Sequence, residues 1–75
     1  MITLIEAFKL CGIRNDEIVH LRDAGADRWC STPFTGFQVR YKLDMKNTKV
    51  VAINARFTCG EYEGFEFEIA KWRNS

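Results

Sequence analysis

The chain has 75 residues, of which 47% are hydrophobic and 28% are charged, proportions that suit one small globular domain. Its formal net charge of +1 produces no global field, so strong non-specific binding to nucleic acid is not implied. Cys11, Cys30 and Cys59 are odd in number and include no Cys-x-x-Cys pair, which argues against a disulfide framework. The apolar start of the chain is interrupted at Glu6 and Lys9, which argues against a signal peptide or membrane span and predicts a cytoplasmic protein.

A short amphipathic helix is predicted over residues 4–11. Thr3 and Glu6 have the spacing of a capping box, in which the threonine hydroxyl accepts a hydrogen bond from the backbone N–H of Glu6. Gly12 stands where a left-handed C-cap is needed. Apolar residues recur at helical spacing between these two signals, namely Leu4, Ile5, Phe8 and Cys11.

Two pairs of strands are predicted on either side of the middle of the chain. Residues 17–22 and 28–31 have strand character and are separated by the glycine-containing link 23–27, which suits a hairpin. Between Lys49 and Trp72, two alternating runs flank the link 60–64. The side chains expected on the buried faces of these two runs are Val51, Ile53, Ala55 and Phe57, then Phe65, Phe67 and Ile69.

The segment 36–43 is ambiguous between strand and helix. Apolar and polar residues alternate strictly from Phe37 to Leu43, and this period favours a half-buried strand. A helix over residues 36–43 is the alternative, because Thr35 is a competent N-cap and good helix formers follow it. The whole pattern predicts one α+β domain over residues 1–75, with the N-terminal helix packed on an antiparallel sheet of four or five strands centred on the last hairpin.

Three constellations of reactive side chains have ordinary structural interpretations. A zinc site is not predicted, because Cys11, His20, Cys30 and Cys59 each come from a separate element, whereas structural zinc sites draw ligand pairs from local turns. A thiol enzyme that uses Cys30 with His20 lacks a visible third residue to orient the imidazole. His20 alternates with buried neighbours, so we expect it on the solvated face of its strand. Enzymatic activity, a metal and a cofactor are therefore not predicted.

Charged residues form two separate stretches. Glutamates cluster near the C-terminal end, and we expect Glu66 and Glu68 to occupy the solvated face of the last strand. The complementary basic stretch contains Arg40, Lys42, Lys46 and Lys49, interleaved with aromatic residues. It is a candidate nucleic-acid surface. If the segment is a strand, however, its rings and its cations point to opposite faces.

The leading functional hypothesis from the sequence is a small non-enzymatic module that binds another protein or a second copy of itself. Trp29, Tyr62 and Trp72 are the candidate partner-binding residues, because exposed aromatic side chains are frequent anchors of interfaces. A short chain with no disulfide framework also gains stability when it buries more surface by self-association. The alternative is a nucleic-acid-binding accessory domain that uses the basic stretch.

Overall fold

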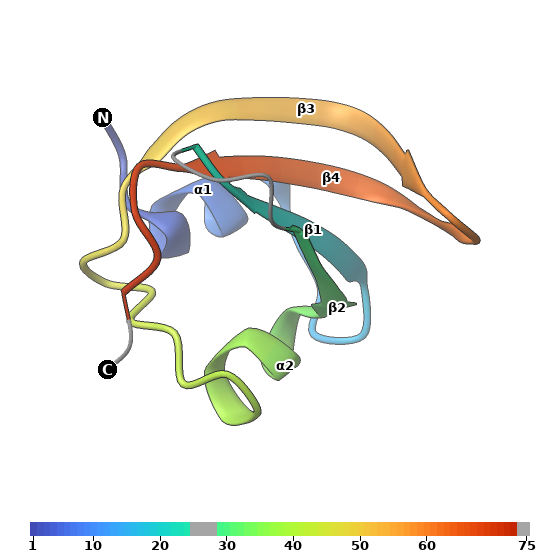
Figure 1. Ribbon diagram of the computed structural model, residues 1–75, viewed down its shortest axis with the longest axis horizontal. Coiled ribbons are helices and arrows are strands. Elements are labelled where there is room, and N and C mark those ends of the chain that lie inside the picture. The colour runs from blue at the N-terminus through green and yellow to red at the C-terminus, as the bar shows by residue number, and fades with distance from the viewer. Residues whose placement is uncertain (25–28, 74–75) are drawn as a thin grey trace.

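The computed structural model describes residues 1–24 and 29–73, without the side chains of Trp29 and of residues 56–59. Its elements in chain order are α1 (Leu4–Cys11), β1 (Ile18–Asp23), β2 (Trp29–Pro33), α2 (Phe34–Val39), β3 (Val50–Cys59) and β4 (Tyr62–Ile69). The strands form a four-stranded sheet in the order β2-β1-β4-β3 that curves round both helices (Figure 1). The predicted α+β class is confirmed.

One strand pair differs from the wholly antiparallel sheet that the sequence predicts. β1 and β2 are antiparallel, as are β3 and β4, but β1 runs parallel to β4. A parallel pair needs a long crossover, and the chain from β2 through α2 to β3 supplies it. β4 therefore lies inside the sheet and β3 at its edge. Residues 25–27 of the predicted first link, and the side chain of Phe57, lie outside the described residues.

The helix α1 occupies the residues predicted for it and ends where its capping signals indicate. The Glu6 N–H donates to the Thr3 hydroxyl at 3.3 Å, and the Thr3 N–H donates to the Glu6 carboxylate at 2.9 Å. Gly12 has a φ of +67°, the left-handed conformation that glycine adopts without strain. The Leu4 N–H donates to the carbonyl of Thr48 at 2.8 Å, which ties the start of α1 to the segment before β3.

The hydrophobic core lies between α1, α2 and the concave face of the sheet. Phe8 is at its centre, with its ring edge-to-face against Phe34 at 4.7 Å and Phe67 at 4.9 Å between centroids. The core residues are Leu4, Ala7, Phe8, Val19, Leu21, Phe37, Leu43, Met45, Val50, Phe67 and Ile69.

The strand favoured over residues 37–43 is wrong. The segment contains the end of α2, which begins at Phe34, two residues earlier than the helix alternative, and ends at Val39. The alternation of apolar residues does not report burial here, because Phe37 is buried while Val39 and Tyr41 are exposed. The helical alternative was therefore right in kind and wrong in its limits.

Close packing of α2 on β2 explains the helix better than any local signal. The N-cap residue Pro33 provides no side-chain hydrogen bond. Gly36 instead lets α2 approach β2, because a Cβ at this position would overlap the side chain of Thr32. After α2 the chain turns at Lys42, whose φ is +52°, and returns Leu43 to the core.

The buried face predicted for β3 is also corrected. Val51 is 44% exposed, Ile53 is 37% exposed and Ala55 is exposed, whereas Val50 is buried. The pairing of β3 with β4 shifts register between Val50 and Ala52, and this bulge displaces the period-two pattern. β3 is moreover an edge strand, so its side chains have neighbours on one side only.

Candidate functional site

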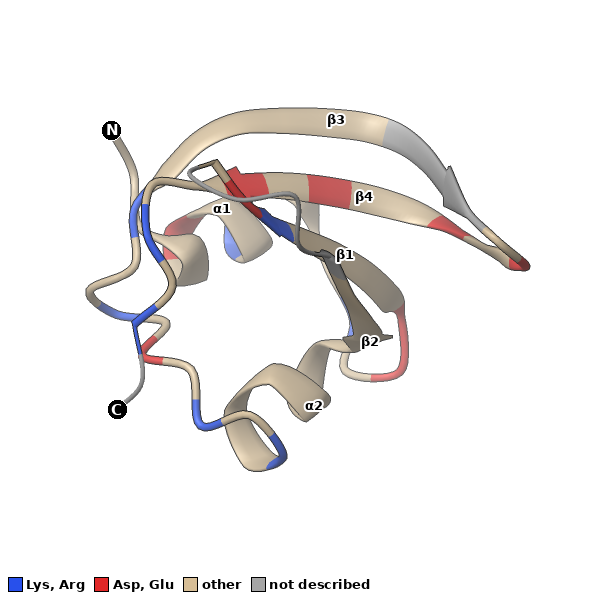
Figure 2. Cartoon of the chain, in the orientation of Figure 1, with Lys and Arg blue, Asp and Glu red and all other residues tan. Residues whose placement is uncertain are grey.

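Six exposed basic side chains gather along one side of the molecule. The Asp44 N–H donates to the carbonyl of Arg73 at 2.8 Å, and the Ala70 N–H donates to the carbonyl of Lys49 at 3.0 Å. The C-terminal segment therefore lies against residues 44–49, and blue segments from both parts of the chain follow this side in Figure 2. We call this surface the basic side, and it consists of Arg40, Lys42, Lys46, Lys49, Lys71 and Arg73.

The predicted basic stretch supplies four of these residues, and sequence reasoning missed the other two. Lys71 and Arg73 follow the last strand and flank Trp72, at a distance of more than twenty positions from Lys49. The order of a basic, an aromatic and a basic residue around Trp72 was the sequence signal that could have indicated these two residues. The backbone contacts between residues 44–49 and 70–73 bring the two groups of cations together.

Two carboxylates lie near the basic side and are occupied by local partners. Asp44 accepts hydrogen bonds from the backbone N–H and the Nδ2 of Asn47, at 3.3 and 2.9 Å. The hydrogen bond from the Asn47 side chain is the main cause that lowers the pKa of Asp44, and Arg73 contributes to it. The pKa of Glu6 is lowered chiefly by its hydrogen bonds with Thr3. Both carboxylates are therefore negatively charged at neutral pH. The six cations of the basic side outnumber these two charges.

Two aromatic rings accompany the cations. Tyr41 is partly exposed, and its ring lies edge-to-face with Trp72, with centroids 6.2 Å apart and planes at 86°. Trp72 itself is half-buried and packs against the core. A hydrogen bond with Cys30 is the largest cause that raises the pKa of Tyr41, while Arg40 lowers it. Tyr41 is therefore a neutral phenol at physiological pH and lies beside a cation of the basic side.

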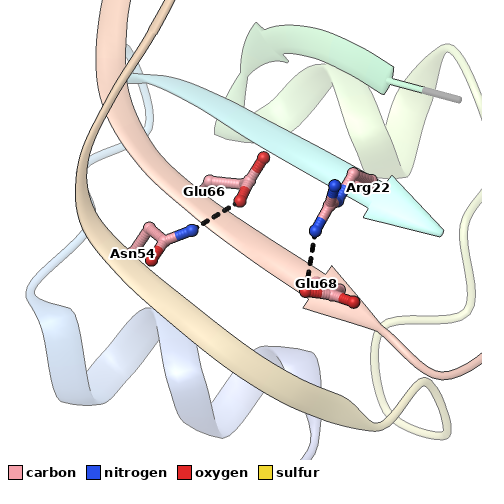
Figure 3. A network of polar contacts seen from close by, with 4 residues as sticks. All are labelled: Arg22, Asn54, Glu66 and Glu68. Atoms are coloured by element: carbon pink, nitrogen blue, oxygen red, sulfur yellow. Dashed lines mark hydrogen bonds and ion pairs between the residues drawn. The ribbon is translucent and has the colours of Figure 1, made fainter. Parts of the chain in front are cut away.

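A row of polar side chains crosses all four strands of the sheet. Ser31, His20, Glu66 and Asn54 occupy paired positions on β2, β1, β4 and β3. The Nδ1 atom of His20 lies 2.7 Å from the Ser31 hydroxyl oxygen. Asn54 Nδ2 donates to Glu66 Oε1 at 2.7 Å (Figure 3). These contacts connect β1 to β2 and β3 to β4.

This polar row corrects the sequence-based placement of two residues on a solvated face. His20 is 0% exposed and Glu66 is 2% exposed. Burial lowers the pKa of His20, and the charge of Glu66 opposes that effect. Serine, histidine and glutamate are the residue types of a hydrolase triad, but such a triad needs contact with a substrate, and this imidazole is shielded from solvent. The Arg22–Glu68 ion pair, at 3.0 Å, joins β1 to β4 beside this row (Figure 3). Such cross-strand pairs favour one register of the strands.

The structure does not bring the two residues of the thiol-enzyme hypothesis together. Cys30 pairs directly with Leu21, so it shares the face of Leu21 and not that of His20, which is the next residue along β1. Over the residues that the structure describes, no group of three His, Cys, Asp or Glu side chains has the arrangement of a metal site. The side chain of Cys59 lies outside this description.

The three predicted partner-binding aromatic residues do not form one patch. Tyr62 is exposed at the first position of β4, and Trp72 follows the end of that strand. Eight strand residues span about 25 Å, so these two side chains lie at opposite ends of the molecule. The side chain of Trp29 is among those not described.

Tyr62 instead lines an open cavity beside α2. The cavity has a volume of about 500 Å³ and also borders Ser31 and Thr35. Val39 and Arg40 border it from the C-terminal end of α2. An aromatic ring, an exposed aliphatic side chain and an arginine therefore share one groove.

Comparison with known proteins gives no relative: no described protein family, curated protein or solved structure matches the chain. Among the described residues, no helix is long and apolar enough to cross a membrane. The cytoplasmic location remains a prediction from the sequence.

Proposed function

We propose that this protein is a non-enzymatic module that binds nucleic acid through its basic side. The observation that carries the proposal is the gathering of six exposed cations from two distant parts of the chain, on a molecule whose net charge is only +1. Contacts between such cations and phosphates supply most of the affinity of non-specific nucleic-acid binding. The uneven distribution of charge orients the molecule toward a polyanion even though its net charge does not.

The aromatic residues strengthen this choice over the protein-binding hypothesis. The sequence-based objection was that a strand over residues 37–43 would separate its rings from its cations. The segment is instead a helix end and a turn, and Tyr41 lies beside Arg40. Neighbouring aromatic and basic side chains are typical of surfaces that bind single-stranded nucleic acid.

A salt titration with fluorescent single-stranded and duplex oligonucleotides tests the proposal. We expect the logarithm of the binding constant to fall linearly with the logarithm of salt concentration, with a slope of about −0.7 to −0.9 for each phosphate contact. The double variant Lys46→Gln/Lys71→Gln should reduce the steepness of that slope by about 1.4 to 1.8 and weaken binding at low salt. The matched control is Lys9→Gln/Arg14→Gln, which removes two cations outside the basic side.

Equal losses in both double variants, or no binding at low salt, would overturn the proposal. The groove beside α2 then favours the second candidate, a protein-binding module. Tyrosine and arginine are frequent hot-spot residues, and Tyr62 and Arg40 both line that groove next to the exposed Val39. Binding to a protein partner through such anchors depends only weakly on salt.

A further inference from the structure

The outer edge of β3 is open to a further strand over most of its length. On one side β3 pairs with β4. On the other side, among the residues that the structure describes, only its start is covered, where Thr3 pairs with Lys49 and the Val50 N–H donates to the carbonyl of Ile2 at 2.9 Å. Within the described part of the chain, no strand pairs with this edge from Val51 onward.

Only some of the usual protections against pairing are present on this edge. Exposed edges are normally short, carry charged side chains or proline, or are bent by bulges. The pairing of β3 with β4 shifts register between Val50 and Ala52 and between Asn54 and Phe57, with regular pairing from Ala52 to Asn54. The opposite edge strand, β2, has five residues, ends in Pro33 and continues directly into α2. β3 has ten residues, and its segment 51–55 is a run of exposed residues with neither charge nor proline, reading Val-Ala-Ile-Asn-Ala.

We infer that the edge of β3 pairs with the β3 edge of a second copy of this chain. Two copies related by a two-fold axis present the same backbone groups to each other in antiparallel orientation, so the interface is self-complementary. The joined sheet would have eight strands, four from each copy. Val51 and Ile53, both partly exposed, would then gain neighbours across the axis.

Charge favours a second copy as the occupant. The segment 51–55 brings no like charges together when it faces itself, and a net charge of +1 causes little repulsion between copies. A partner recognised by its charge would find no ion pair to make within residues 51–55, which Lys49 and Arg56 flank in the sequence. The inference is independent of nucleic-acid binding, because the six side chains of the basic side lie outside residues 51–55.

Sedimentation equilibrium on the full chain over a concentration series tests the inference. We expect a reversible dimer of twice the 8.7 kDa chain mass. Ile53→Lys should raise the dimer dissociation constant by at least about tenfold, because two lysines meet near the axis. Leu10→Lys is the matched control, since Leu10 is an exposed apolar residue on α1 and should leave the constant unchanged.

Amide hydrogen exchange gives a second measurement that does not depend on the folding of a variant. Protection of residues 51–55 in the wild-type chain should rise with protein concentration, whereas protection of α1 should not. A chain that stays monomeric at every concentration overturns the inference. So does a dimer that Ile53→Lys leaves intact, or one whose formation does not protect residues 51–55.

Discussion

His20 shows how far a local pattern determines the environment of a single residue. Its alternation with Val19 and Leu21 places it on the face of the sheet opposite to theirs, and its pairing with Ser31 agrees with that placement. The pattern does not reveal that this face is also covered at β1. Period two determines to which side a strand residue points, whereas burial depends on what packs there.

The buried imidazole predicts a decrease in stability on mild acidification. The pKa of His20 is lowered in the folded protein, relative to about 6.5 in an unfolded chain. The unfolded state then binds more protons, so the stability is complete above about pH 6.5 and falls as the pH decreases from there toward the lowered pKa. We expect urea midpoints to decrease over this window. Because His20 is the single histidine, His20→Gln should remove most of the decrease, and an unchanged slope in that variant would contradict the assignment.

At the scale of elements, the two helices have different origins. α1 is specified by neighbouring residues, through the capping box of Thr3 and Glu6 and through Gly12, and so it could be predicted with its limits. α2 has no side-chain cap, and its position depends on the fit between Gly36 and Thr32 across the junction with β2. Because this contact lies between two elements, no periodic pattern in the sequence of either element indicates it.

A double-mutant cycle at this junction separates packing from helix propensity. Gly36→Ala should destabilise the protein by about 1–3 kcal/mol, because the added methyl group overlaps Thr32. In a Thr32→Ala background the overlap with the threonine hydroxyl and methyl groups is gone, although the Cβ of residue 32 still lies 3.0 Å from the added methyl group. Alanine also favours a helix over glycine by about 0.5–1 kcal/mol. Gly36→Ala should therefore lower the free energy of unfolding by clearly less in the Thr32→Ala background than in the wild type. Equal costs in both backgrounds, measured by urea denaturation, would exclude the packing explanation.

At the scale of the whole molecule, the C-terminal segment closes the fold. Its backbone contacts residues 44–49, and Trp72 packs against the core and against the ring of Tyr41. The same contacts assemble the basic side from two stretches of sequence. The contacts of the C-terminal segment with residues 41–49 therefore contribute both to stability and to the candidate binding surface.

Removal of the Trp72 indole should accordingly reduce the stability of the fold. Trp72→Ala is expected to cost less than the about 3–5 kcal/mol of a fully buried tryptophan, but clearly more than 0.5 kcal/mol. Tyr62→Ala, at the exposed start of β4, should stay within about 0.5 kcal/mol. Thermal unfolding of both variants measures the difference. Equal stability of the two would show that Trp72 does not contribute to closing the fold.

The sequence by itself determined the α+β class, the helix over residues 4–11, the two hairpins and four of the six basic-side residues. Each of these depends on residues close together in the chain, whose capping, turn or period-two signals act locally. Only the tertiary structure decided the parallel pairing of β1 with β4, the helical state of α2, the burial of His20 and Glu66, and the addition of Lys71 and Arg73 to the basic side. These features arise where separate elements meet, and the free energy of such contacts depends on residues that no local pattern relates to one another.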